Sequence, residues 1–325
     1  MKAKTNTSRR TIKALRGHWL PLLLFCTYLL QCCHLPESKM ITTSPSPIKH
    51  YVFLGHTYDW QAREANRVDP RIEKIGLDTF DQIWLGGDIC TATTRDSNTL
   101  DYLDSLFHIS DESTCWSVGN HDFREGNTQY ITRKTGRPLY YLTHHDSLSV
   151  LVINGMMEHS FYKDSCDYKA GQLAFLTGAL EHLPPSTHLV VLAHPILWDN
   201  VVDPPLLDAR SSANAAASWM DLTCQKPSEF KDVLYPKLVE WQKRGVQVLL
   251  LTGDGGQYDK AYYHRLDNGI ELFISGINNS FDFSQPDKDH RKFNQDPDSI
   301  LIFTHDLRQH KLTGKFVQLN EYIAP

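Results

Sequence analysis

Short apolar runs alternate with longer amphipathic segments along the chain from residue 50 onward. The apolar runs have the length of strands and are rich in leucine, β-branched and aromatic residues, which favours buried strands. Strands are predicted at residues 51–55, 82–85, 113–118, 147–153, 189–193, 246–251 and 272–275. Helices are predicted at residues 70–80, 98–108, 170–183 and 228–244. Because strands and helices alternate, the chain is expected to have an α/β fold with helices covering the outer faces of its sheets.

The first 33 residues have a different character from the rest. A basic segment precedes an apolar run at residues 19–30, and Gln31, Cys32 and Cys33 follow. This order is typical of an export signal. The apolar run is shorter than the about 20 residues of a comfortable membrane span. Residues 1–33 are therefore predicted to be an export signal, and removal after export is favoured over a retained anchor.

The end of this signal resembles a bacterial lipoprotein box, because a leucine stands three positions before each of Cys32 and Cys33. The residue just before either cysteine is larger than usual, so lipid anchoring and ordinary cleavage both stay open. The protein is expected in the periplasm or cell envelope, in contact with a membrane only through this segment. The proline-containing residues 34–48 predict a flexible tether. The domain is predicted at residues 49–325, with an insertion or a surface loop at residues 203–227.

Charge and cysteine content exclude some classes of protein. The net charge of −5 argues against nucleic-acid binding driven by overall charge. The four cysteines beyond the export signal form no C-x-x-C pair, which argues against a zinc ribbon or a thioredoxin-type site. Their spacing fixes no disulfide pairing, and buried free thiols are favoured. These four cysteines are Cys90, Cys115, Cys166 and Cys224.

Candidate metal ligands follow five of the apolar runs. The five residues are His56, Asp88, Asn120, His194 and Asp254. Any one of them alone has an ordinary structural explanation, such as a turn or a satisfied core histidine. Because ligands of α/β sheets bind beyond the carboxyl ends of the strands, we expect all five to converge on one crevice.

Two of these positions lie within longer motifs, Gly87-Asp88 and Gly119-Asn120-His121-Asp122. Together with the lone His194 after an apolar run, they resemble the calcineurin-like metallophosphoesterases, a group that includes the purple acid phosphatases. The resemblance covers roughly residues 50 to 305. It implies a four-layer α/β/β/α sandwich and metal-dependent hydrolysis of phosphate esters.

The resemblance also implies a role for each motif residue. Asp88 would bridge two metal ions, since a carboxylate has two oxygens, while Asn120 and His194 would bind the second ion. His121 would face the phosphoryl group as a general acid or electrostatic clamp, oriented by Asp122. Two ions, drawn from Mn, Fe, Zn or Mg, would activate a bridging water for attack on phosphorus.

The first and last motifs depart from the family pattern. Where the family has D-x-H, this chain has His56-Thr57-Tyr58, followed by Asp59; where it has G-H-x-H, this chain has Gly253-Asp254-Gly255-Gly256. Asp254 can replace a histidine as a ligand of the second metal. The first metal would keep His56 and Asp88, with Tyr58 or Asp59 as further candidates. A tyrosine ligand must lose its proton, which requires a strongly acidic cation.

Three functional interpretations follow from these departures. The favoured one is an exported phosphoesterase with two metals that acts on a phosphorylated small molecule or surface substrate, either a monoester or a diester. The second is a hydrolase with one metal. The third is a catalytically impaired domain that serves as a binding or scaffold lipoprotein at the cell surface. The intact His121-Asp122 pair weighs against the third interpretation.

Overall fold

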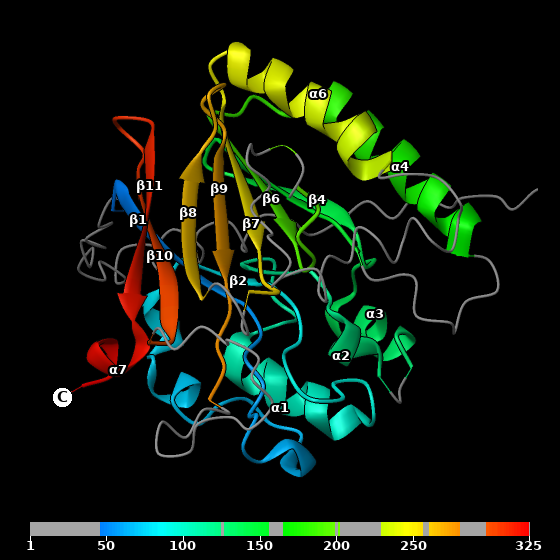
Figure 1. The fold of residues 1–325 in the computed structure, drawn as a ribbon, viewed down its shortest axis with the longest axis vertical. Coiled ribbons are helices and arrows are strands. Elements are labelled where there is room, and N and C mark those ends of the chain that lie inside the picture. Colours follow the sequence, from blue (N-terminus) through cyan, green and yellow to red (C-terminus); the bar gives the residue numbers. More distant parts are fainter. Residues whose placement is uncertain are drawn as a thin grey trace, which may run out of the picture. The chain divides into compact units, whose positions relative to one another are not determined.

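Two β-sheets form the centre of the structure, a computed structural model (Figure 1). It describes residues 46–124, 127–155, 165–198, 201, 229–255, 260–279 and 297–324. Contacts join Ser46–Pro325 into one compact unit. The predicted export signal, the predicted tether up to residue 45 and the predicted insertion at 203–227 lie outside the described residues.

The first sheet has five strands in the order β11-β10-β1-β2-β3. The strands are β1 (Ile48–Leu54), β2 (Gln82–Leu85), β3 (Thr114–Trp116), β10 (Ser299–Asp306) and β11 (Lys311–Gln318). β1, β2 and β3 run parallel, whereas β10 pairs antiparallel with β1 and with β11. Every residue of β2 is buried, as expected for a parallel strand covered on both faces.

The second sheet has six strands in the order β4-β5-β6-β7-β9-β8. They are β4 (Tyr141–His145), β5 (Leu148–Val152), β6 (His188–Ala193), β7 (Gln247–Thr252), β8 (Ala261–Arg265) and β9 (Glu271–Ser275). β5, β6, β7 and β9 run parallel, and the two edge strands β4 and β8 are antiparallel to their neighbours. The carboxyl ends of β1, β2, β6 and β7 carry candidate metal ligands predicted from the sequence.

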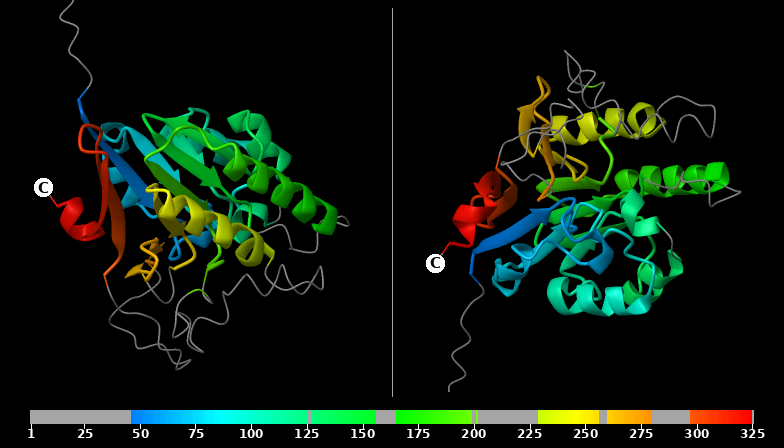
Figure 2. Two further views of the ribbon diagram at one scale, coloured as in Figure 1. Left: turned by 90° about the horizontal axis from the view of Figure 1, so that it is seen from above. Right: turned by 60° about the horizontal axis from the view of Figure 1, so that its bottom comes forward.

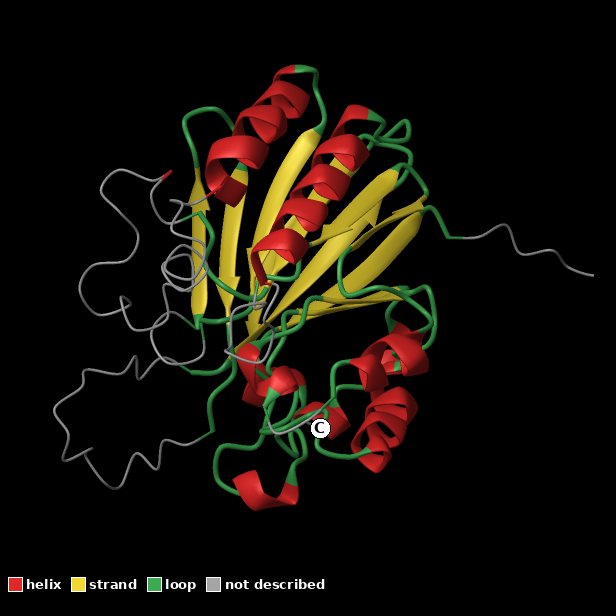
Figure 3. Ribbon diagram, turned by 90° about the vertical axis from the view of Figure 1, so that its right-hand side faces the viewer, coloured by secondary structure: helices red, strands yellow, loops and turns green. Residues whose placement is uncertain are grey.

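The helices lie on the outer sides of the two sheets (Figures 2 and 3). They are α1 (Ser97–Phe107), α2 (Asn120–Phe123), α3 (Gln129–Thr135), α4 (Ser165–Glu181), α6 (Glu229–Lys243) and α7 (Leu319–Tyr322). α1 begins after Asp96, whose side chain accepts a hydrogen bond from the Thr99 N–H at 2.9 Å, as an N-cap does. α4 and α6 lie side by side.

Three apolar clusters hold these elements together. One cluster lies between the sheets and includes Phe53 of β1 and Val190 of β6. A second joins the six-stranded sheet to α4 and α6 and includes Val191. A third joins the five-stranded sheet to α1 and includes Val52. Neighbouring residues of one strand thus serve different clusters, because successive side chains point to opposite faces of a sheet.

The α/β class predicted from the alternating pattern is confirmed. Each predicted strand has a counterpart, and so do the helices predicted at 98–108, 170–183 and 228–244. The helix predicted at 70–80 is wrong: two 3-10 turns, Ile72–Lys74 and Leu77–Thr79, occupy this segment. Gly76 between them has a φ of 70°, which interrupts a right-handed helix.

Two further expectations concern cysteines and membranes. Cys90 and Cys115 are buried free thiols, as favoured from the sequence. The side chains of Cys166 and Cys224 lie outside the described part. Within the described ranges, no helix is both long and apolar enough to cross a membrane.

Candidate metal centre

The candidate centre lies where the carboxyl ends of strands from both sheets meet. His56 follows β1 and Asp88 follows β2, and the His56 N–H donates to the Gly87 carbonyl at 3.0 Å. His194 follows β6 and Asp254 follows β7, and the Asp254 N–H donates to the His194 carbonyl at 3.0 Å. Four of the five predicted donors are therefore held by backbone that continues directly from a buried strand.

Glycine allows the two sheets to approach each other at these strand ends. The backbone of Gly253 after β7 lies so close to the backbone of Gly86 after β2 that a Cβ atom on Gly253 would overlap the Gly86 carbonyl. Because Gly253 precedes Asp254 and Gly86 lies two residues before Asp88, this contact brings donors from the two sheets together. A side chain at Gly253 would force the sheets apart.

Two carboxylates and two histidines face one another in the centre. The Asp88 Oδ2 atom lies 3.2 Å from His56 Nε2 and 3.6 Å from His194 Nε2. The Asp254 Oδ1 atom lies 3.6 Å from His194 Nε2 and 3.9 Å from His56 Nε2. All four residues are buried. One donor atom from each of His56, Asp88 and Asp254 lies within 4.8 Å of the others, so this cluster can hold a metal ion.

Unpaired polar atoms support this interpretation. Among the described residues, Asp88 Oδ2 and His194 Nε2 are buried and have no partner in hydrogen-bonding geometry. Burying such atoms unpaired is costly, whereas a bound cation would satisfy them. His194 Nδ1 lies 2.7 Å from the Gly86 carbonyl oxygen. Donating a proton there leaves the Nε2 lone pair free, which is how metal-binding histidines are usually oriented. The donors present therefore fit a metal ion.

The charges of the carboxylates and histidines in the centre shift the pKa values of Asp88 and His194. Burial alone would raise the pKa of Asp88, but His194, His121 and His56 outweigh it and lower the pKa below its ordinary value. Burial raises the pKa of Asp254 to about 6. For His194, burial acts to lower the pKa, and the two carboxylates outweigh it and raise the pKa. Asp88 is thus the residue whose negative charge the surrounding histidines stabilise most.

Asp88 and His56 both adopt the left-handed backbone region, with φ values of 54° and 57°. This conformation is uncommon outside glycine and tends to occur at functional sites. Asp122 stabilises the Asp88 turn, since its carboxylate accepts the N–H groups of Asp88 at 3.0 Å, Ile89 at 3.0 Å and Gly119 at 2.8 Å. Burial, followed by repulsion from Asp88, raises the pKa of Asp122 to about 6.

The orientation of His121 differs from the one expected. Asp122 is expected to orient the ring, but His121 Nδ1 lies 2.9 Å from the Thr91 carbonyl oxygen. The His121 N–H donates to Asp88 Oδ1 at 2.7 Å, and its Nε2 lies 4.0 Å from Asp88 Oδ2. Burial lowers the pKa of His121. The ring therefore turns Nε2 toward the centre, and Asp122 acts on the Asp88 turn instead.

Asn120 and Tyr58, two further candidate metal ligands, lie in different surroundings. Asn120 is the first residue of α2 and is partly exposed. The buried Tyr58 ring stacks between His121 and Trp60, with ring centroids 4.6 and 4.4 Å away. Burial, strengthened by Asp88, raises the pKa of Tyr58, so the phenol keeps its proton unless a cation displaces it.

Asp59 serves a turn. Its Oδ1 atom accepts hydrogen bonds from the N–H groups of Gln61 and Ala62 at 2.9 and 3.1 Å and from Asn279 Nδ2 at 2.9 Å. These bonds tie the Oδ1 atom of Asp59 to its own turn and to Asn279. Gly256, at the end of the last motif, lies outside the described residues.

Sequence reasoning missed the loop that follows Asp88. Thr91 supplies the carbonyl that orients His121, and the Thr93 hydroxyl donates to Asp122 at 2.5 Å. Thr94 donates to the Asp122 carbonyl at 2.8 Å. Thr93 and Thr94, two hydroxyl side chains soon after the Gly-Asp motif, are the signal that could have identified the support of Asp122.

Comparisons with known proteins bear on the fold. No family model matches the chain, and no curated protein matches it. Among solved structures, the chain is similar to "GAP50 the anchor in the inner membrane complex of Plasmodium", with a TM-score of 0.52 and 14% identity over 84% of this chain and 85% of that one. A phosphopantetheinyl hydrolase, PptH, from Mycobacterium tuberculosis gives a TM-score of 0.42 and 11% identity over 76% and 96% of the two chains. The first likeness concerns the fold alone, and the second is too remote to support a functional argument.

Proposed function

We propose that this chain is a metal-dependent phosphoester hydrolase of the calcineurin-like type. The observation that carries the proposal is the convergence of His56, Asp88, His194 and Asp254, which follow four strands in the order of the family motifs, in one buried cluster. The three apolar clusters, one between the sheets and one under each outer helical layer, support the four-layer α/β/β/α arrangement that the family resemblance implies.

Asp88 is the proposed link between two metal positions. On one side, His194 and Asp254 would bind with Asp88 and with Asn120 at the start of α2. On the other side, His56 would bind with Asp88, and Tyr58 is the further candidate. The bound cations, Mn, Fe, Zn or Mg, would supply a Lewis acid and an activated water for attack on phosphorus.

His121 is the proposed group that contacts the phosphoryl oxygens or the leaving group. The Thr91 carbonyl fixes the ring through Nδ1, so Nε2 is the atom available to a substrate. The stack with Tyr58 restricts the ring further, with the two centroids 4.6 Å apart. Asp122 is the proposed positioning residue, because it holds the backbone of Asp88 and does not contact the reacting groups.

Metal analysis and parallel assays test this function. Protein purified without chelator and then loaded with each ion should bind about one or two ions per chain. It should hydrolyse p-nitrophenyl phosphate or bis-p-nitrophenyl phosphate, and the two assays distinguish a phosphatase from a phosphodiesterase. Asp88→Asn should lose activity, and the surface variant Asp81→Asn should keep it. Protein that binds no ion after loading would refute the proposal and favour the binding or scaffold interpretation.

Export is the remaining part of the proposal. The order of basic, apolar and cysteine residues in segment 1–33 supports removal of this segment and location in the periplasm or cell envelope. Intact-mass analysis of protein expressed with its leader separates the alternatives. A chain starting at Cys32 or Cys33 with added acyl mass indicates lipid anchoring, an unmodified shorter chain indicates ordinary cleavage, and full-length protein contradicts removal.

A further inference from the structure

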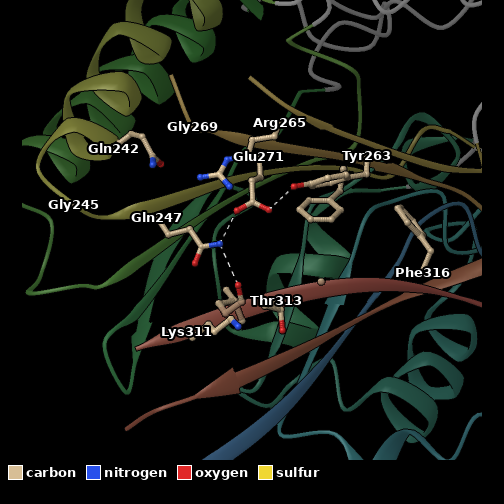
Figure 4. Close-up of a pocket in the computed structure, with 13 residues that line it drawn as sticks. Gln242, Gly245, Gln247, Tyr263, Arg265, Gly269, Glu271, Lys311, Thr313 and Phe316 are labelled. Atoms are coloured by element: carbon tan, nitrogen blue, oxygen red, sulfur yellow. Dashed lines mark hydrogen bonds between the residues drawn. The ribbon is translucent and has the colours of Figure 1, made fainter. Parts of the chain in front are cut away.

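A groove of about 690 Å³ lies at the opposite end of the strands from the metal centre (Figure 4). It is bounded by β8 and β9 of the six-stranded sheet and by β11 of the five-stranded sheet. Gln247, the first residue of β7, lines it, whereas Asp254 of the metal centre follows the other end of the same strand. None of the residues assigned to the metal centre lines this groove.

One part of the groove is aromatic. The Tyr263 and Phe273 ring centroids are 4.9 Å apart, and those of Phe273 and Phe316 are 6.2 Å apart. Tyr263 is 49% exposed, although it is large and mostly apolar. Gly314 lies beside these rings, where a Cβ atom would approach Phe303 to 2.7 Å. The wall therefore offers apolar surface that the described residues leave partly uncovered.

The other part is polar and carries excess positive charge. Glu271 accepts hydrogen bonds from Gln247 Nε2 at 2.8 Å and from the Tyr263 hydroxyl at 3.1 Å, both neutral donors. Arg265 and Lys311 line the same groove and are exposed. Across the described part of the chain, neither of these two cations forms an ion pair. Arg265 lies opposite Glu271 in the β8–β9 pair, and Lys311 lies opposite Asp306 in the β10–β11 pair. An anionic ligand would therefore meet two cations that each have an acidic cross-strand neighbour but form no ion pair with it among the described residues.

Two of the strands that line the groove, β8 and β11, are edge strands. β8 is the last strand of its sheet, and β11 is the last strand of the other. Along β11, residues alternate between exposed Lys311, Thr313 and Lys315 and the less exposed residues between them. An edge strand offers unpaired backbone groups to any further strand. On β11 the Leu312 carbonyl already accepts a hydrogen bond from Gln247 Nε2 at 3.1 Å, so an added strand would pair with other backbone groups or displace this side chain. A strand added beside β11 would place every second side chain over the aromatic wall and the others beside the lysines.

The charge on these edges selects the kind of partner. In an antiparallel pair of two β11 strands centred on Thr313, Lys311 of one copy would lie opposite Lys315 of the other, which like-charge repulsion opposes. A segment with acidic residues at alternate positions would instead meet both lysines and Arg265 with opposite charge. The apolar residues between them would cover Tyr263 and Phe316.

We propose that this groove binds an extended acidic segment of a partner protein, which alternates apolar and acidic residues and adds to the free edge of β11. The backbone of the added strand would supply hydrogen bonds, and alternate side chains would supply selectivity. The inference is independent of the metal centre, because it uses other residues at the other end of the sheets.

Fluorescence anisotropy with synthetic peptides tests the proposal. The probe is a fluorescein-labelled octapeptide that alternates glutamate with valine and tyrosine, titrated with the full chain at low salt. Binding at micromolar concentration is expected. A peptide with lysine in place of each glutamate should bind at least about ten times more weakly. A third peptide, with proline in place of two valines, should also bind weakly because it lacks strand hydrogen bonds.

Matched variants locate the site. Lys311→Glu and Arg265→Glu should each weaken binding of the acidic peptide about tenfold. Lys74→Glu, an exposed lysine on a 3-10 turn far from the groove in sequence, should not. Circular dichroism should show that all three variants are folded, and their metal content should match the parent.

Three outcomes would overturn the proposal. The acidic peptide fails to bind, it binds equally to Lys311→Glu, or the lysine peptide binds as well as the acidic one. A stable dimer of the peptide-free chain, measured by light scattering and abolished by Lys311→Glu, would show that a second copy occupies the groove instead.

Discussion

The two sides of Asp88 differ in how firmly their histidines are held. His194 is fully buried, and its Nδ1 is fixed on the Gly86 carbonyl, so its Nε2 is already directed at Asp88 and Asp254. His56 has a buried Nδ1 without a hydrogen-bond partner in the described part of the chain. A ligand whose other nitrogen is anchored loses less freedom when it binds a metal. We therefore expect a tight metal site on the His194 side and a weaker one on the His56 side.

The largest expected effect comes from removing the residue that both sides share. Asp88→Asn keeps the size of the side chain but removes the charge that both sides share, so Asp254 is the one assigned carboxylate ligand that remains. Hydrolysis of a phosphate ester should fall by at least about 100-fold, and metal analysis should show the loss of both ions. Activity within tenfold of the parent would contradict the role of Asp88.

The second prediction separates the two sides directly. His194→Ala should abolish tight metal binding, whereas His56→Ala should lose only the weaker ion. The difference in apparent affinity for the first ion should be about 10-fold to 100-fold, as found when the anchoring of a metal-binding histidine is lost. Isothermal titration calorimetry of the metal-free variants with Mn or Zn measures this difference in affinity. Equal affinities in the two variants would contradict a tighter metal site on the His194 side.

The third prediction concerns the support beneath Asp88. Asp122→Ala would leave the N–H groups of Asp88, Ile89 and Gly119 without their acceptor. Because these groups are buried, the free energy of unfolding should fall by about 2–4 kcal/mol. Urea denaturation of the metal-free protein measures the change. Thr93→Val, which removes one donor to the same carboxylate, is the milder comparison and should cost less than Asp122→Ala.

The fourth prediction compares two histidines at opposite ends of strand β6. His194 follows its end, and its pKa is raised, whereas burial followed by the charge of His305 lowers the pKa of His188, at the start of the strand, to about 4. The unfolded chain therefore binds a proton at His188 below its usual pKa of about 6.5, while the folded chain stays neutral until about pH 4.

The stability contributed by neutral His188 is full above pH 6.5 and is lost as the pH falls from about 6.5 to about 4. The loss should amount to about 1–3 kcal/mol. In His188→Gln the slope of unfolding free energy against pH should flatten within this window. An unchanged slope would show that His188 does not titrate in this way.

The smallest effect is expected at Tyr58. Because burial raises its pKa, the phenol should stay protonated with divalent ions and contribute mainly its ring to the stack with His121 and Trp60. Tyr58→Phe should then change the affinity for Mn or Zn by less than about threefold. A larger loss would show that the weaker side uses Tyr58 as a ligand.

Residues that follow a buried strand could be predicted from the sequence, and those that act through loop contacts could not. His56, Asp88, His194 and Asp254 each follow an apolar run, so their convergence required only the rule for strand ends. The role of the Thr91 carbonyl could not be predicted from residue type, because every residue has a backbone carbonyl. Asp59 was a ligand candidate by position alone, and the hydrogen bonds of its Oδ1 atom within its own turn depend on a loop conformation that residue type does not give.

The same division applies to the fold. Strands buried on both faces, such as β2 and β7, were predicted because their residues are continuously apolar. The strands β4, β8, β10 and β11 were not predicted. In β8 and β11 at least half of the residues are exposed, and β11 contains Gly314. Their edge positions, and therefore the groove between them, depend on which strands become neighbours, and local sequence does not encode this.

The contact between Gly253 and Gly86 also bears on the order of events during folding. These glycines follow strands of different sheets and are far apart in the chain, so their contact closes a long loop. The donors on either side of it meet only after both sheets have formed and docked. A cation that needs both Asp88 and Asp254 is therefore expected to bind after the sheets have docked and not to nucleate folding. Adding the ion should therefore slow unfolding and leave the refolding rate nearly unchanged.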